Sequence, residues 1–145
     1  MITVMTSRSV LRLLDANANR ALEGVRVCEE IVRFHVESPR LFRTLRALRH
    51  AIAQAVRRLP VSRVDLARCR DSRRDVGSRA PSSRVDTLER LLVINFQRAK
   101  ESLRTLEECA RLIAPHHAAA FQRLRFRTYD TERHTLLALA ALRRA

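Results

Sequence analysis

The sequence predicts an all-α protein: a bundle of four long helices, built as a duplicated αα-hairpin with an ordered loop at its centre. Three observations lead to this prediction. Apolar residues recur at three- and four-residue steps over long stretches, which is the spacing of one helix face. The 145 residues include only two glycines and four prolines, too few for the turns of a many-stranded fold. One polar motif also occurs twice, starting at Asn17 and again at Asn95, a shift of 78 residues.

Size and composition favour one soluble helical domain over residues 1–145. A chain of this length can bury a core without disulfides or metals, and 46% hydrophobic residues exclude a disordered basic tail. No apolar run approaches the ~20 residues that a membrane span needs. The first twenty residues contain no evident signal peptide, and Cys28, Cys69 and Cys109 form no CxxC pair. We therefore expect a cytoplasmic protein with reduced thiols.

The first half of the chain predicts two long helices and one short one. A helix over 8–36 has an apolar face formed by Leu14, Ala18, Ala21, Leu22, Val25, Cys28 and Val32. Ser38 and Pro39 form an N-cap and first-turn pair, so a second helix is expected over 39–59. Its apolar face is formed by Leu41, Leu45, Leu48, Ile52, Val56 and Leu59. The SRVD sequence from Ser62 resembles a capping box and predicts a short helix over 62–69.

The second half repeats this order after a polar loop over 70–83. A second SRVD sequence predicts a helix over 84–113, with Leu88, Leu92, Phe96, Ala99, Leu103, Leu106 and Ala110 on its apolar face. Pro115 begins a fourth helix over 116–142, with Phe121, Leu124, Thr128, Thr131, Thr135, Leu139 and Leu142 facing inward. The FRTLR sequence ending at Arg46 matches the FQRLR sequence ending at Arg125. This second match is the other argument for duplication; convergence of two amphipathic helices is the alternative.

The repeated motif places the same polar residues on both long helices. The matched pairs are Asn17 with Asn95, Arg20 with Arg98, Glu23 with Glu101, Arg26 with Arg104, Glu29 with Glu107, Glu30 with Glu108, and Arg33 with Arg111. Their spacing allows a ladder of glutamate–arginine pairs along each helix. Such exposed ladders are common and stabilise by only ~0.3–0.5 kcal/mol per pair, so a purely structural role is one interpretation.

Glu29 and Glu107 suggest a second interpretation, because each lies within an apolar sector of its helix. A buried carboxylate is costly unless it is paired or binds a metal. Arg26 lies three residues before Glu29, and Arg104 lies three residues before Glu107. The pattern therefore predicts two carboxylates with flanking guanidiniums that point toward the bundle interior or a cleft.

The charge balance favours an anionic partner. The net charge is +14 and the pI is about 11.6, carried almost wholly by arginine, because Lys100 is the only lysine. Nucleic acid, an acidic membrane or a phosphorylated small molecule would suit this charge, as would a merely solvated surface. No P-loop, GxGxxG, HExxH or GxSxG motif occurs. Any phosphate would therefore be held by arginine side chains, with paired carboxylates for Mg²⁺.

The central loop offers further groups of the same kind. Arg70, Asp71 and Asp75 supply one guanidinium and two carboxylates, and Gly77 offers a hinge. This spacing is a weak metal signal. The alternative is a charged surface loop whose aspartates pair with the neighbouring arginines.

Four motifs together resemble a known family: LLDANANRALEGVRVCEEIVRF, RDSRRDVGS, NFQRAKESLRTLEECARL and RLRFRTYDTE. They resemble the helical domain often found in front of the barrel of thiamine-phosphate synthases, an alternative hydroxymethylpyrimidine-phosphate kinase. The resemblance extends over roughly residues 10–133, with the motifs in the same order. No synthase barrel follows in this sequence, so the resemblance implies a stand-alone form.

The resemblance implies ATP-dependent phosphorylation of 4-amino-5-hydroxymethyl-2-methylpyrimidine phosphate to its diphosphate, with Mg²⁺ as cofactor. The acceptor is a phosphate monoester with a second pKa of ~6, so it needs no general base at pH 7. The difficulty is charge, because two unit charges 4 Å apart repel by ~4 kcal/mol at an effective dielectric constant of 20. Guanidiniums and Mg²⁺ would neutralise that repulsion.

Residue roles follow as hypotheses from these motifs. The expected phosphate clamps are Arg20, Arg26, Arg70, Arg98 and Arg104. The expected Mg²⁺ ligands, or partners of those arginines, are Glu29, Glu107, Asp71 and Asp75. Asn17 and Asn95 could bind the aminopyrimidine edge, as asparagine binds adenine. The remaining expected substrate-binding residues are Glu23, Glu101, Arg46, Arg49, Arg125 and Tyr129, the last four on the nucleotide side.

Three alternatives to the kinase stay open. The first is a non-catalytic helical partner of a separate thiamine-phosphate synthase. The second is a basic nucleic-acid-binding protein, although the chain has no evident helix-turn-helix and only 4% aromatic residues. The third is an arginine-lined helical mutase. Our expected partners are a phosphorylated small molecule, a nucleotide and the synthase, without nucleic acid or membrane; a homo-oligomer is compatible with the sequence.

Overall fold

The computed structural model describes residues 6–82 and 84–144, and these residues form helices without any β-strand. The all-α prediction is therefore confirmed for the described part of the chain. Its elements, in order, are α1 (Arg8–Ile31), a π-helical turn (Val32–Val36), α2 (Pro39–Arg57), α3 (Arg63–Cys69), a 3₁₀ turn (Ser72–Arg74), α4 (Leu88–Ile113), a second 3₁₀ turn (Pro115–His117) and α5 (Ala118–Arg144).

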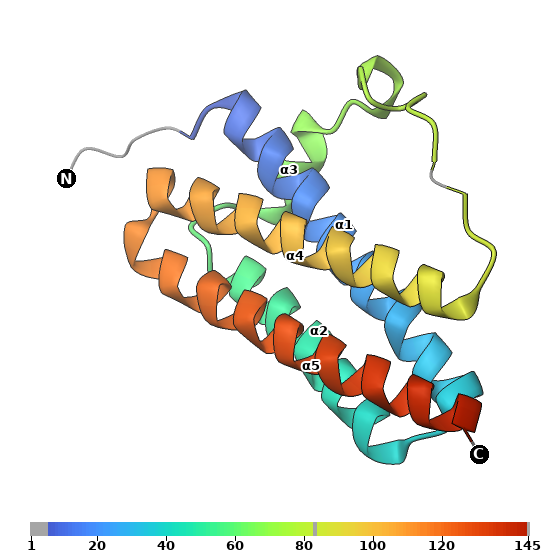
Figure 1. Ribbon diagram of the computed structural model, residues 1–145. Helices are drawn as coiled ribbons and strands as arrows, with labels where there is room; N and C mark the ends of the chain where they lie inside the picture. Colours follow the sequence, from blue (N-terminus) through green and yellow to red (C-terminus); the bar gives the residue numbers. More distant parts are fainter. Residues whose placement is uncertain (1–5, 83, 145) are drawn as a thin grey trace.

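The four long helices pack in a closed ring around one core. In this ring α1 contacts α2 and α4, and α5 contacts α4 and α2 (Figure 1). Phe96 of α4 and Phe121 of α5 are the largest fully buried side chains, surrounded by leucines from all four helices. The short α3 packs on α1 outside the ring, so the first half of the molecule has an extra layer (Figure 1).

Small residues allow α1 and α4 to approach each other closely. Ala21 and Ala99 are fully buried, and a methyl group added to Gly24 would lie 2.8 Å from the carbonyl oxygen of Asn95. Farther along, the thiol of Cys28 donates to the carbonyl oxygen of Leu92 at 3.7 Å. The end of α1 therefore lies beside the beginning of α4, and the two helices run antiparallel.

Side-chain caps fix the helix starts, and one of them differs from the prediction. The hydroxyls of Ser38 and Ser62 accept hydrogen bonds from the backbone N–H groups of Leu41 and Asp65, as the sequence predicts. The second SRVD sequence does not start α4. Instead Thr87 is the N-cap, with its hydroxyl 3.0 Å from the N–H of Arg90, while residues 84–86 are not helical. Ser83 lies outside the described residues.

Two residues predicted to face inward are exposed. Leu88 is 42% exposed because it is the first residue of α4, before the helix reaches its neighbours. Leu142 is 44% exposed because it lies in the last turn of α5. The three threonines of α5 are buried as predicted, and each hydroxyl donates to the carbonyl four residues earlier.

Candidate functional site

A cavity of about 640 Å³ opens between α1 and α4, and only these two helices line it. Its ten lining residues fall into five pairs that are each 78 residues apart. The pairs are Asn17 with Asn95, Arg20 with Arg98, Glu23 with Glu101, Gly24 with Ser102, and Val27 with Thr105. On each helix these positions are separated by one, three or four residues, so they form one face. The cavity is thus approximately two-fold symmetric about the point where the helices cross.

The two asparagines at the edge of this cavity have a defined orientation. Asn17 donates its amide N–H to the carbonyl oxygen of Leu13, and Asn95 donates to that of Leu91, both at 2.9 Å. A carbonyl oxygen can only accept, so the nitrogen of each amide faces the backbone. Both side chains are buried, and each keeps its amide oxygen and one N–H for other partners.

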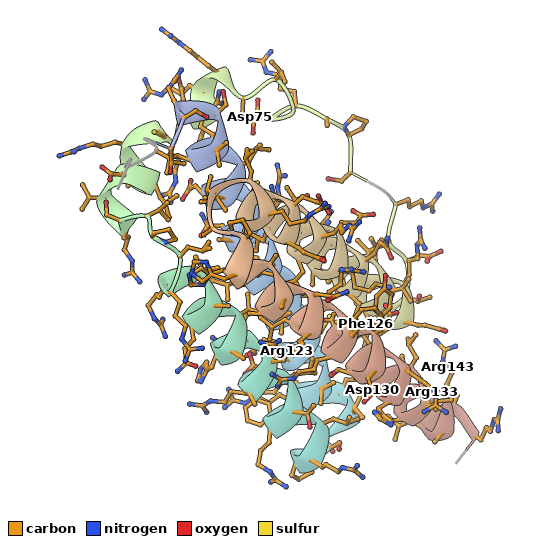
Figure 2. All side chains as sticks on the ribbon, turned by 90° about the vertical axis from the view of Figure 1, so that its left-hand side faces the viewer. Asp75, Arg123, Phe126, Asp130, Arg133 and Arg143 are labelled. Atoms are coloured by element: carbon orange, nitrogen blue, oxygen red, sulfur yellow. The ribbon has the colours of Figure 1, made fainter. Side chains whose placement is uncertain are left out.

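A second cavity, of about 440 Å³, adjoins the first and shares Asn17 and Arg20 with it. It lies between the N-terminal half of α1 and the loop after α3. Arg70, Asp71 and Asp75 line it from the loop, so the structure brings these predicted residues close to Arg20. Figure 2 shows Asp75 near the beginning of α1, far from the labelled side chains Arg123, Asp130 and Arg143 of α5.

An ion pair joins this loop to α1. The guanidinium of Arg70 donates to both carboxylate oxygens of Asp15, at 2.8 and 2.7 Å. These hydrogen bonds, and the negative charge of Asp15, raise the pKa of Arg70. Asp15 is buried and was missed in the sequence analysis. The available signal was an acidic residue directly after Leu14, in the apolar stripe of α1.

A third cavity, of about 670 Å³, lies behind this ion pair, between α1, α2 and α3. Asp15, Asn19 and Arg70 line both the second and the third cavity, so the ion pair separates them. The walls of the third cavity are mainly apolar and include Leu22, Ala53, Val56, Val61, Leu66 and Ala67.

The predicted inward-facing carboxylates are buried, but they do not share a cleft. Glu29 is 1% exposed, and its two oxygens accept from the guanidinium of Arg49 on α2, at 2.7 and 3.2 Å. Glu107 is 6% exposed, and one of its oxygens accepts twice from Arg125 on α5, at 3.2 and 3.1 Å. Each pair ties the two helices of one hairpin together. Both carboxylates therefore point into the bundle interior, as the pattern predicts, but each is neutralised within its own hairpin.

Helix geometry explains the separation of Glu29 from Glu107. Each lies eight residues after a matched small residue, Ala21 on α1 and Ala99 on α4, near the close contact of Gly24 with Ala99, and the two helices run in opposite directions. At a rise of 1.5 Å per residue, this places the backbone positions of the two glutamates roughly 24 Å apart along the helix axes.

Arg26 and Arg104 do not line the α1–α4 cavity. Arg26 is half-exposed and pairs with Glu30 at 3.1 Å, and Arg104 pairs with Glu108 at 3.3 Å. Both also approach the buried glutamates, at 3.9 Å for Arg26–Glu29 and 3.4 Å for Arg104–Glu107. Both arginines thus belong to ladders of intrahelical ion pairs, as in the structural interpretation of the repeated motif. The exposed Arg46 and Tyr129 do not line any of the three cavities either.

The four predicted Mg²⁺ ligands do not form a cluster. Within residues 6–82 and 84–144, no three His, Cys, Asp or Glu side chains gather so that they could hold a metal ion. Asp71 accepts from the N–H of Arg74, and Asp75 accepts from the N–H of Gly77, so each carboxylate also shapes the loop. Both nevertheless line the second cavity, where a metal ion bound to phosphates could reach them.

The buried cysteines are unreactive in character. Burial, reinforced by the negative charge of Glu132, raises the pKa of the Cys28 thiol. Burial and the charge of Glu108 likewise raise the pKa of Cys109. A raised pKa keeps a thiol protonated at neutral pH, so neither side chain has the properties of a nucleophile.

Comparison with known proteins relates most of the chain to one family. A model of the ThiD2 family matches residues 12–134. Three curated relatives, each named thiamine-phosphate synthase, are 38% identical to this chain. They come from Rhodopirellula baltica, Synechocystis sp. and Gloeobacter violaceus, and the matches cover 97%, 86% and 90% of this chain.

The chain spans little more than a third of the length of these relatives, at 38%, 35% and 38% respectively. No solved structure matches it. Among the described residues, no helix is long and apolar enough to cross a membrane.

Proposed function

This chain belongs to the ThiD2 family, and we propose that it acts in thiamine biosynthesis as a kinase of a pyrimidine phosphate. The reaction would transfer the γ-phosphoryl group of ATP to 4-amino-5-hydroxymethyl-2-methylpyrimidine phosphate and so form the diphosphate. The names of the relatives support a place in thiamine biosynthesis. The phosphotransferase activity rests on the family resemblance and on the chemistry of the two adjoining cavities.

The observation that carries the proposal is the α1–α4 cavity, in which Arg20 and Arg98 face one ligand space from two helices. Phosphoryl transfer needs positioned cations more than a base or a nucleophile from the protein. Arginine supplies a planar, permanently charged fork that fits phosphate oxygens. The 78-residue correspondence of the lining residues also supports our proposal that the fold is a duplicated αα-hairpin.

The adjoining cavity offers a binding place for the second substrate. Because Arg20 lines both cavities, it could contact phosphates on both sides of the transfer. Arg70 and Arg12 add positive charge to the second cavity, and Asp71 and Asp75 add the carboxylates that Mg²⁺ accepts alongside phosphate oxygens. When bound, Mg²⁺ would neutralise part of the charge on the phosphates. The amide of Asn17, between the cavities, would bind the aminopyrimidine or its phosphate.

A coupled ADP-release assay tests the kinase, with ATP, Mg²⁺ and the pyrimidine monophosphate. We expect turnover that depends on the acceptor and falls at least 100-fold in Arg20→Ala. Arg26→Ala is the matched control, because Arg26 lies six residues farther along α1 and outside the cavities; its rate should stay within threefold. Absence of turnover in the unaltered protein, or equal loss in both variants, would contradict the proposal.

A second candidate function is that of a non-catalytic partner of thiamine-phosphate synthase. It is favoured by the names of the relatives and by the fact that they are much longer than this chain. Size-exclusion chromatography with a synthase barrel, together with the assay above, separates the two. A stable complex without any ATP turnover would favour the partner.

A further inference from the structure

The approximate two-fold symmetry of the α1–α4 cavity indicates the shape of its ligand. Arg20 directly precedes Ala21 on α1, and Arg98 directly precedes Ala99 on α4, so the two guanidiniums start from equivalent points beside the helix crossing. A ligand with two like anionic ends could be held equally by both. We propose that this cavity binds a diphosphate group, with one phosphoryl unit on each guanidinium and the bridging oxygen near the local two-fold axis.

A diphosphate matches this arrangement better than a single phosphate does. The two phosphoryl units of inorganic pyrophosphate are chemically alike and are related by a two-fold axis through the bridging oxygen, and a diphosphate ester keeps the same two centres of negative charge. Each can take a bidentate contact from one guanidinium. The cavity, at about 640 Å³, also has more room than one phosphate needs. The inference rests on the proposed function for its ligand class, since both products there, the pyrimidine diphosphate and ADP, carry a diphosphate group.

The floor of the cavity fits this ligand. Gly24 and Ser102 occupy equivalent positions in its lining, and both are buried, so neither adds a large side chain to the cavity. The two asparagines of the lining each retain one N–H, which could donate to a phosphoryl oxygen.

Glu23 and Glu101 also line the cavity and oppose an anionic ligand. Both are exposed, and Glu101 accepts a hydrogen bond from Gln97 at 2.9 Å. Their charge should weaken diphosphate binding without blocking it, because solvent screens exposed charges. Replacing one of these glutamates should therefore strengthen ligand binding, whereas replacing an arginine should weaken it, so the site can be tested in both directions.

Isothermal titration calorimetry of the full chain with inorganic pyrophosphate tests the inference without any turnover. We expect pyrophosphate to bind at least tenfold more tightly than orthophosphate. Arg20→Ala and Arg98→Ala should each weaken pyrophosphate binding at least fivefold, by factors within threefold of each other. Glu23→Gln should strengthen binding.

Arg26→Ala and Arg104→Ala are the matched controls, because each removes one positive charge from the same helix outside the cavity. They should change pyrophosphate affinity by less than twofold, and circular dichroism should show that all variants fold. Equal affinity for orthophosphate, no pyrophosphate binding, or a loss confined to Arg20→Ala would overturn the inference. The last result would move the ligand into the cavity beside Arg70. Symmetric pyrophosphate binding without kinase activity would overturn the proposed reaction and leave the inference intact.

Discussion

Each hairpin of the bundle contains a buried glutamate–arginine pair, but the two hairpins differ at the position of Leu22. In the α1–α2 hairpin, Leu22 and its neighbours line a cavity of about 670 Å³ that α3 covers. In the α4–α5 hairpin, the residue 78 positions after Leu22 is Lys100. Its ammonium lies 2.9 Å from a carboxylate oxygen of Glu132 and 4.8 Å from the ring centre of Tyr129. At this equivalent position the second hairpin therefore has an internal ion pair where the first has an apolar cavity wall.

The difference continues at the central loop. Asp15 on α1 holds Arg70, whereas the equivalent position on α4 is Val93. The shared cavity between α1 and α4 thus has a nearly symmetric floor, but the loop and its charges lie on one side only. A nearly symmetric floor can hold two like groups of a ligand. The charges of the central loop, which lie on one side only, can distinguish the chemical groups attached to each of them.

The largest expected effect comes from breaking the buried ion pairs. Arg49→Met should lower the free energy of unfolding by about 3 kcal/mol, because Glu29 would stay buried after losing its bidentate partner. Arg125→Met should cost less, since Glu107 is less buried and keeps Arg104 at 3.4 Å, whereas Arg26 is farther from Glu29, at 3.9 Å. Urea denaturation measures both.

Glu30→Gln is the surface control for these variants, and it should change the free energy of unfolding by less than about 0.5 kcal/mol. If Arg125→Met proved as costly as Arg49→Met, or more so, the difference between the two hairpins would disappear.

A smaller effect is expected at the helix crossing. Gly24→Ala adds a methyl group 2.8 Å from the carbonyl oxygen of Asn95, so α1 and α4 must separate. Overpacking costs ~1–3 kcal/mol, which should outweigh the helix-propensity gain of ~1 kcal/mol and give net destabilisation. Ser102→Ala, at the equivalent position, makes the side chain smaller and should be tolerated better. Thermal unfolding compares the two; a Gly24→Ala variant more stable than the unaltered protein would contradict the close approach.

The smallest and most local effect should follow from Asp15→Asn. The neutral amide cannot accept two charge-assisted hydrogen bonds from Arg70, so the loop should be held less firmly. We expect faster amide hydrogen exchange at Ser72–Arg74, while amides in the middle of α4 exchange as before. Asp65→Asn is the control, because Asp65 pairs only loosely with Arg68, at 3.7 Å on the surface of α3. An unchanged loop in Asp15→Asn would show that Arg70 does not anchor it.

Much of this architecture could be predicted from local patterns. The apolar stripes, together with the caps at Ser38 and Ser62, gave helices close to the observed ones, because both depend on neighbours three or four residues away. The beginning of α4 could not be predicted in this way, since Thr87 competes with the SRVD sequence as a cap. The burial of Glu29 and Glu107 was also predictable, because the period of the helix places them among apolar residues.

The partners of those glutamates were not predictable. Matching FRTLR with FQRLR aligns Arg46 with Arg125, but the residue that bonds Glu29 is Arg49, one turn later. The π-helical turn and the left-handed Glu37 (φ 56°) form the link before α2, whereas a 3₁₀ turn precedes α5. The ion-paired residues are accordingly 20 apart in the first hairpin and 18 apart in the second. The geometry of the connection between the two helices decides which arginine meets the glutamate, and a local motif does not contain that geometry.

By itself the sequence determined which faces of the helices are apolar and which polar residues are repeated, because both follow from spacing along one chain segment. Only the tertiary structure decided what those residues do. In the folded protein the repeated motif has two roles. Glu29 and Glu107 are structural, because arginines of the next helix neutralise them, whereas Arg20 and Arg98 line the α1–α4 cavity. The physical reason is the antiparallel crossing at Ala21 and Ala99, which brings nearby repeat positions together and moves distant ones to opposite ends.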